Sequence, residues 1–183
     1  MRLSLMLEKE IKTERLIIKP PQMDDAAELT ELINDKSVVK WLSDIPFPYT
    51  VRHAEEFIER SQEKALKNES YNFMIFQNNK MLGGIGLTEF RNQSCELGYW
   101  LGKKYWRNGF ATEAVTGMLD FGFIQLNLIE IFASYKIGNE GSKRVLTKCG
   151  FQFNREKQEF DSVLLKEETL IEMININAAE DQP

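Results

Sequence analysis

Residues 96–114 read ELGYWLGKKYWRNGFATEA, and this stretch decides the fold. Its apolar side chains first alternate, at Leu97, Tyr99 and Leu101, with the period of a β-strand. Beyond Gly109 the spacing becomes that of a helix. A strand that passes through a glycine turn into a helix leaves several backbone N–H groups without partners, all pointing the same way. The stretch therefore predicts a binding site for a ligand that carries phosphate groups.

Length and composition limit the class of protein. The chain has 183 residues, 43% of them apolar, so we expect one domain over residues 1–183 with its core between about 13 and 175. The net charge of −5 argues against general binding of nucleic acid or anionic membranes. No segment has the length of a membrane span or of a signal peptide's apolar part, so we expect a cytoplasmic protein. Cys95 and Cys149 are predicted to be free thiols in the core.

The periodicity of the rest of the chain predicts the other elements. Two asparagines, Asn78 and Asn79, suit a tight hairpin turn, and Gly150 suits a helix end. The order predicts an α+β fold with one mixed, mostly antiparallel sheet of about seven strands flanked by helices. In chain order we expect a strand over 15–19, helices capped by Asp24, Asp35 and Thr50, strands over 71–76, 81–90 and 96–101, a helix over about 110–126, a strand over 128–135, a short helix capped by Asn139, and closing strands over 151–155 and 168–174.

Four pieces of sequence, in this order, carry a family resemblance. They are TERLIIKPP (13–21), IGL (85–87), ELGYWL followed by YWRNGFATEA (96–101 and 105–114), and IGNEGSKRVLTKCGF (137–151). Together they resemble the GNAT superfamily of acetyl-CoA-dependent N-acetyltransferases, and most closely its branch with the bacterial ribosomal-protein N-terminal acetyltransferases. The resemblance covers roughly residues 13–174. It implies the GNAT fold, in which the central strands splay apart, and acetyl-CoA as cosubstrate.

Two places depart from the pattern of that branch. Arg107 stands where the branch often has Gly, so its side chain either adds a positive charge near the phosphates or faces solvent. The segment FDSVLLKEETLIEM (160–173) lacks the Asn-Gly turn and the following aromatic, His and Asp that the branch often has. Substrate-side residues of this segment therefore cannot be carried over.

The resemblance implies how the cofactor is held. The backbone of Tyr99, Trp100 and Leu101 would pair with the pantetheine amides, and Asn139 would bond the pantetheine arm. The alternatives are an ordinary strand–helix turn for the loop and a helix cap for Asn139. The pyrophosphate would lie on the N–H groups of Arg107, Asn108, Gly109, Phe110, Ala111 and Thr112.

Acetyl transfer to an amine also needs a base and a means of stabilising the departing thiolate. Glu96 is the candidate base, since a carboxylate can bind the amine and accept its proton directly or through water. A structural role for Glu96 in a cross-strand salt bridge is an equally good interpretation. Glu89 is a neighbouring candidate, whereas Glu113 is expected to serve the helix N-terminus. The resemblance points to the Ser142 hydroxyl as a donor to the sulfur, with a plain first-turn serine as the alternative.

The remaining candidates concern the acceptor. His53, the single histidine, is expected to be a surface helix residue, and no metal site is predicted. Trp41, Phe47 and Tyr49 either line the acceptor pocket or belong to the core. We expect the acceptor to be a primary amine, either a protein N-terminus or a small molecule. We expect the protein itself to be a monomer or a homodimer. A non-catalytic module that only binds acetyl-CoA is the alternative.

Overall fold

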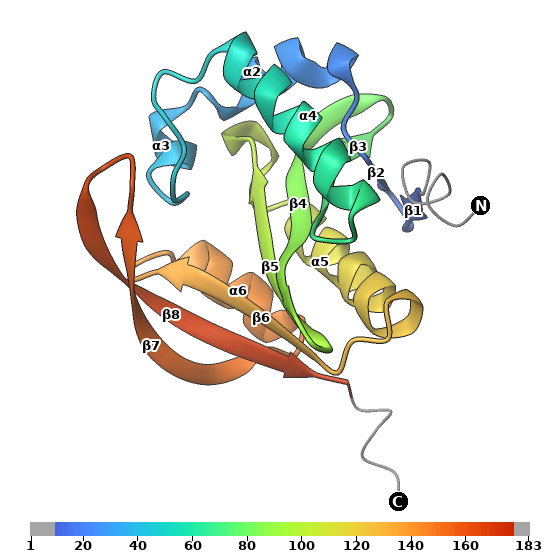
Figure 1. Ribbon diagram of the computed structural model, residues 1–183, viewed down its shortest axis with the longest axis vertical. Coiled ribbons are helices and arrows are strands. Elements are labelled where there is room, and N and C mark those ends of the chain that lie inside the picture. Colours follow the sequence, from blue (N-terminus) through green and yellow to red (C-terminus); the bar gives the residue numbers. More distant parts are fainter. Residues whose placement is uncertain (1–9, 178–183) are drawn as a thin grey trace, which may run out of the picture.

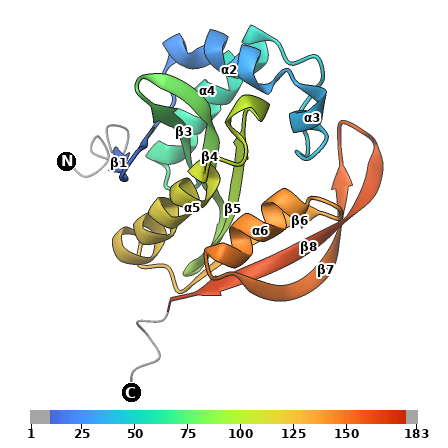
Figure 2. The same ribbon diagram turned by 180° about the vertical axis from the view of Figure 1, so that it is seen from behind.

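A computed structural model describes residues 10–177. One eight-stranded sheet runs through these residues in the order β1-β2-β3-β4-β5-β6-β8-β7. Helices α2 and α4 cover one face of the sheet, and α5 and α6 cover the other (Figures 1 and 2). The strands are β1 (Ile11–Lys12), β2 (Ile17–Lys19), β3 (Tyr71–Gln77), β4 (Lys80–Arg91), β5 (Ser94–Leu101), β6 (Glu130–Lys136), β7 (Gln152–Asp161) and β8 (Lys166–Ile176). The α-helices are α2 (Ala26–Ile33), α3 (Lys36–Val39), α4 (Val51–Leu66), α5 (Phe110–Asp120) and α6 (Glu140–Lys148).

The N-terminal half of the sheet is an antiparallel meander. β3 and β4 are joined by Asn78 and Asn79, whose φ angles of 49° and 61° confirm the predicted turn. The side chain of Thr50 accepts a hydrogen bond from the backbone N–H of His53 and so caps α4, as the sequence predicts. Asp35 caps α3 in the same way, through the N–H of Ser37. Local capping chemistry therefore accounts for where these helices begin.

The centre of the sheet contains its single parallel pair within residues 10–177. β5 and β6 share only three paired positions, which run from Ser94–Glu130 to Glu96–Phe132. Beyond Glu96 the two strands diverge, and Figure 1 shows β5 and β6 opening from their common lower end. This confirms the predicted splay. We call the space between the diverging strands the β5–β6 gap.

Two hydrophobic clusters hold the layers together. The larger lies between the sheet and helices α5 and α6, and contains Phe73, Phe121 and Ile131. The smaller lies on the opposite face, where Leu29 of α2 and Ile58 of α4 pack with β3 and β4. Since each helix buries its apolar stripe against the sheet, the two clusters fix the positions of the loops that surround the gap.

Several boundaries differ from the predictions. The sheet has eight strands instead of about seven, because Ile11–Lys12 adds an edge strand that is too short to show a period. Asp24 lies within a turn of 3₁₀ helix, so Asp25 stands at the N-cap of α2. The helix expected over about 110–126 is α-helical only to Asp120 and continues as a π-helical segment over Phe121–Gln125. The two closing strands are several residues longer than expected, because β7 and β8 pair with each other along most of their length.

The cysteines, the helices and the cavities of the fold each bear on which ligands it could bind and on whether it could cross a membrane. Burial raises the pKa of the Cys95 thiol to about 12, so this cysteine is an inert core residue, and Cys149 is half-buried and also free. Within residues 10–177 no helix combines the length and the apolar character that a membrane crossing needs.

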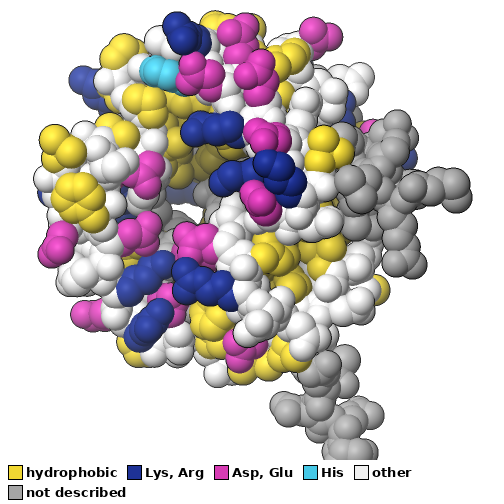
Figure 3. Space-filling model, viewed as in Figure 1, with side chains coloured by type: hydrophobic (Ala, Val, Ile, Leu, Met, Phe, Trp, Pro, Cys, Tyr) yellow, Lys and Arg dark blue, Asp and Glu magenta, His cyan; other side chains and the backbone are white. Residues whose placement is uncertain are grey.

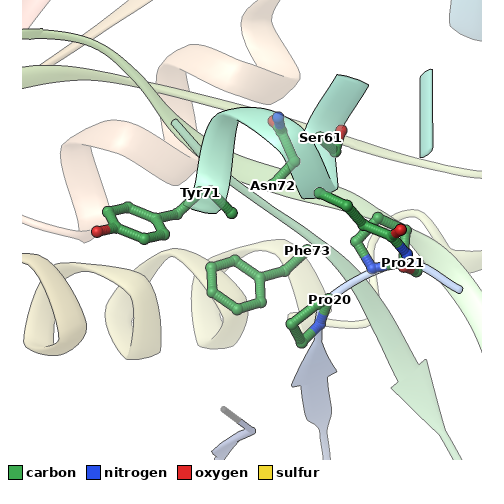
Figure 4. A pocket seen from close by; sticks show the side chains of 8 residues that line it. Pro20, Pro21, Ser61, Tyr71, Asn72 and Phe73 are labelled. Atoms are coloured by element: carbon green, nitrogen blue, oxygen red, sulfur yellow. Dashed lines mark hydrogen bonds between the residues drawn. The ribbon is translucent and has the colours of Figure 1, made fainter. Parts of the chain in front are cut away.

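Figure 4 shows a cavity under α4, lined by Pro20, Tyr71 and Phe73 among others. Its volume of about 10 Å³ suits one water molecule at most.

Candidate active site

The β5–β6 gap exposes one edge of β5. The N–H of Gly102 donates to the carbonyl of Leu82 at 2.9 Å, so Gly102 and every second residue before it direct their peptide groups toward β4. The peptide groups of Tyr99 and Leu101 therefore point into the gap. Those of Trp100 point toward β4, and its side chain packs against the α2 and α4 cluster. The open edge can thus pair with an amide-bearing ligand at Tyr99 and Leu101.

Trp106 closes the outer end of this edge. Its indole Nε1 donates to the carbonyl oxygen of Leu101 at 2.7 Å. The tryptophan therefore fixes where the strand ends and the loop begins. It also satisfies one of the polar groups of β5 that face the gap, which leaves the Leu101 N–H and the Tyr99 peptide groups.

The loop between Trp106 and α5 is built to expose its amides. Arg107 and Gly109 both have left-handed backbone conformations, with φ angles of 62° and 80°. None of the N–H groups of residues 107–112 donates to another residue in the part of the chain that the structure describes. A Cβ at Gly109 would lie 3.3 Å from the guanidinium of Arg15 and would also force the left-handed strain on a larger residue. Six free amides at the start of an eleven-residue helix form a cradle that fits a pyrophosphate.

The ion pair between Arg15 and Glu113 supports this cradle, and we call it the brace. Arg15 donates from Nε to Glu113 Oε2 at 2.6 Å and from Nη1 to the carbonyl of Asn108 at 3.1 Å, and it lies over the ring of Phe110. Glu113 also accepts from the Thr13 hydroxyl and from the Arg15 backbone N–H. Burial alone would raise the pKa of Glu113, but these hydrogen bonds outweigh burial and lower it. Glu113 lies in the first turn of α5, where it is expected to serve the helix N-terminus, and its carboxylate is held there by Arg15 and Thr13.

Asn139 and Ser142 meet at the start of α6, on the other side of the gap. Asn139 Oδ1 accepts from the Ser142 N–H at 3.1 Å, so Asn139 is the cap of the helix. The Ser142 hydroxyl lies 2.9 Å from the phenol oxygen of Tyr99. Tyr99 therefore reaches across the gap from β5 to α6.

Glu96 lies at the apex of the gap, where β5 and β6 separate. Both of its carboxylate oxygens accept from Lys157 Nζ at 3.3 Å, and Lys157 also approaches Glu159 at 3.4 Å and Glu172 at 3.8 Å. Burial alone would lower the pKa of Lys157, but Glu96 and Glu159 outweigh it and raise the pKa, so the ammonium stays charged. The cross-strand salt bridge weighed for Glu96 is therefore present, and it leaves Glu96 beside the gap.

The other sequence candidates lie apart from this centre. Glu89 sits on an irregular, exposed part of β4 and pairs with Arg91 at 3.0 Å. His53 closes the cap of α4 by accepting from the Thr50 N–H, as expected of a surface helix residue. Within residues 10–177 no group of three or more His, Cys, Asp or Glu side chains could hold a metal ion.

On the side of α3 and the β7–β8 hairpin, the gap widens into a hollow bounded by two loops (Figures 1 and 3). Figure 3 shows this hollow left of centre, where Figure 1 places the space between α3, β5 and the β7–β8 hairpin. Asp44, after α3, accepts from the Ser162 N–H at 2.9 Å and from its hydroxyl, and so joins the two loops. Tyr49 is buried in the core, Phe47 is 45% exposed, and Trp41 lies beside Gly138 in the β6–α6 turn. Tyr49 therefore belongs to the core, and the role of Trp41 and Phe47 in lining an acceptor pocket stays a prediction.

Sequence reasoning missed three residues of this region: Arg15, Lys157 and Asp44. Arg15 and Lys157 lie 98 and 61 positions from their partners, Glu113 and Glu96. No local period links such pairs.

Comparison with known proteins agrees with this geometry. Residues 15–152 match the family model described as acetyltransferase (GNAT) domain. An uncharacterized N-acetyltransferase, p20 of Bacillus licheniformis, is 32% identical over 144 residues, which cover 76% of this chain and 80% of that protein. The spermidine N(1)-acetyltransferase of Escherichia coli is 24% identical over 76% of this chain and 74% of that protein. A putative ribosomal-protein-serine acetyltransferase from Vibrio cholerae has the same fold, with a TM-score of 0.83 and 24% identity over 93% of this chain and 99% of that one. The chain therefore belongs to the GNAT acetyltransferase family and is an acetyl-CoA-dependent N-acetyltransferase.

Proposed function

We propose that this enzyme acetylates the α-amino group at the N-terminus of a polypeptide. The position proposed for acetyl-CoA rests on one observation: the open edge of β5 leads to six free amides. The amides of residues 107–112 would bind the pyrophosphate. The peptide groups of Tyr99 and the N–H of Leu101, with Asn139 opposite, would hold the pantetheine arm, so that the thioester reaches the apex of the gap near Glu96.

In this proposal Glu96 binds the incoming amine and accepts its proton, directly or through water. Lys157 occupies both oxygens of Glu96, so the acceptor must share this carboxylate with a resident ammonium group. The Ser142 hydroxyl, on the α6 side of the gap, would donate to the sulfur as the thiolate departs.

The shared carboxylate favours an acceptor that loses its proton easily. An α-amino group has a pKa of roughly 8, so about a tenth of it is neutral at pH 7, whereas a lysine side chain at about 10.4 is neutral in only ~0.04% of molecules. The hollow between α3 and the β7–β8 hairpin is open to solvent, which lets the end of a chain enter (Figure 3). The Vibrio cholerae protein with the same fold is described as a putative ribosomal-protein-serine acetyltransferase, which supports a polypeptide acceptor.

A small polycationic amine is the second candidate. It is favoured by the three carboxylates Glu96, Glu159 and Glu172, which already surround one ammonium group, and by the similarity to a spermidine acetyltransferase. Such an amine would take the place of Lys157 or extend beside it.

The test is an acceptor panel with acetyl-CoA, read by thiol release and by mass spectrometry of the product. The panel holds peptides with free N-termini, the same peptides with blocked N-termini and one internal lysine, and polyamines. Transfer to the free peptides alone is the expected result. Transfer to polyamines alone would replace the first candidate by the second. Binding of acetyl-CoA with no thiol release on any acceptor would favour the non-catalytic module instead.

A further inference from the structure

The hydroxyl of Tyr99 contacts Ser142 across the β5–β6 gap, although β5 has no β6 partner at this position. Its ring belongs to the part of β5 that has no partner on β6, yet its hydroxyl reaches α6. There it lies 2.9 Å from Ser142 Oγ and 3.4 Å from the Ser142 carbonyl oxygen. No other side chain in residues 10–177 hydrogen-bonds the Ser142 hydroxyl. The two hydroxyls therefore form an isolated pair at the inner wall of the gap.

The protons of the Tyr99 and Ser142 hydroxyls determine which of the two donates when an anion is nearby. Burial raises the pKa of Tyr99, so the phenol keeps its proton and remains a donor at neutral pH. A serine hydroxyl has one proton and can accept two further hydrogen bonds. If Tyr99 donates to Ser142 Oγ, the serine proton is free to point toward a negatively charged atom in the gap. Asn139 holds the Ser142 backbone in place from the other side.

We propose that Tyr99 is a positioning residue that acts through Ser142, aligning and polarising the serine hydroxyl as it donates to the sulfur of coenzyme A. This inference rests on the proposed role of Ser142 in the transfer. The acyl C–S bond breaks as the new C–N bond forms, and the electron pair of the broken bond stays on the sulfur. Tyr99 and Ser142 stabilise this thiolate by a chain of two hydrogen bonds, without giving up their protons, and water later protonates the sulfur.

A chain of this kind has a property that can be measured without an acceptor. Hydrogen bonding to the thiolate lowers the pKa of the coenzyme A thiol when it is bound. Because hydrogen bonds in a chain polarise one another, removing the Tyr99 hydroxyl weakens the bond that Ser142 makes. The effect of Tyr99 should therefore disappear when Ser142 has no hydroxyl.

The experiment titrates bound coenzyme A by the ultraviolet absorbance of its thiolate in the wild type, Tyr99→Phe, Ser142→Ala and the double variant. Tyr71→Phe is the matched control, because Tyr71 is also largely buried and also donates from its hydroxyl, but to Asn68, far from the gap. We expect the fraction of thiolate near pH 8 to fall about two- to fivefold in Tyr99→Phe and further in Ser142→Ala. The double variant should match Ser142→Ala, and Tyr71→Phe should match the wild type.

With an acceptor in hand, kinetics give a second readout. Tyr99→Phe should lower kcat about three- to tenfold and leave the Kd of acetyl-CoA within about twofold. An unchanged thiol pKa in Tyr99→Phe, or effects of the two substitutions that simply add, would overturn the inference. The same holds if Tyr99→Phe weakens coenzyme A binding and alters nothing else. A lack of transfer to every amine, with the titration as expected, would instead count against the proposed acceptor alone.

Discussion

Arg107→Gly separates the backbone strain of the cofactor loop from the charge of its side chain. Arg107 is exposed and has a φ of 62°, a region that costs a non-glycine residue about 1–2 kcal/mol. Glycine removes this cost but loses about 0.4–1 kcal/mol through the greater freedom of the unfolded chain. We expect a net gain of about 0.5–1 kcal/mol, which raises the Tm of the ligand-free protein by about 1–4 °C.

The same substitution removes one positive charge from the edge of the phosphate cradle. A charge about 5 Å from a phosphate is worth about 0.8 kcal/mol in water, and a pyrophosphate carries more than one such charge. We therefore expect acetyl-CoA to bind about three- to tenfold more weakly at low salt, with the difference shrinking as the salt concentration rises. The variant would thus be more stable and bind less well.

Differential scanning fluorimetry of the ligand-free protein and calorimetric titration at two salt concentrations measure both effects. Arg107→Lys is the control, because it keeps both the charge and the strained conformation, so its Tm and Kd should stay near those of the wild type. A lower Tm for Arg107→Gly would refute the strain argument. An unchanged Kd at low salt would show that the Arg107 side chain faces solvent and has no part in binding the phosphates.

Three further predictions concern the base, the brace and the acceptor hollow. Glu96→Gln should lower kcat/KM about 10- to 100-fold, while Glu89→Gln, on the exposed bulge of β4, should leave it unchanged; equal effects would remove Glu96 from its proposed role. Glu113→Gln should lower the Tm at pH 7 by about 3–8 °C. Hydrogen bonds lower the folded-state pKa of Glu113 below its ordinary value of 4.5, so its stabilisation is complete above that value and is lost as the pH falls through the folded-state pKa. The Tm gap between variant and wild type should therefore close in acid, and a gap that stays constant with pH would contradict this. Asp44→Ala should raise the KM of the acceptor about three- to tenfold with the Kd of acetyl-CoA unchanged, and the reverse pattern would place Asp44 on the donor side.

The fold could be predicted from the sequence because its signals are local. Thr50 and Asp35 cap helices through residues two or three positions away, and Asn78 and Asn79 form a turn that needs nothing else. The splay of β5 and β6 came from the family resemblance, since no single-strand period reports how far two strands stay together. The two-residue strand β1 and the π-helical segment after Asp120 left no periodic trace that could be read.

The candidate site could be predicted in part for the same reason. The loop around Gly109 lies within one continuous stretch, so its exposed amides followed from the order strand, glycine, helix. The contacts between Lys157 and Glu96 and between Tyr99 and Ser142 could not be predicted in this way, because these residues meet only after the sheet has formed. The assignment of these residues to binding and catalysis stays a prediction that the variants above can test.

The brace between Arg15 and Glu113 ties the cofactor loop to the beginning of the chain. Arg15 and Glu113 lie 98 positions apart, so the loop is held in its binding shape only once the N-terminal segment has packed against α5. For the same reason, shortening the protein from its N-terminus beyond Thr13 would release the loop without touching any residue that contacts the ligand. A variant trimmed beyond Thr13 should therefore bind acetyl-CoA more weakly than the full chain.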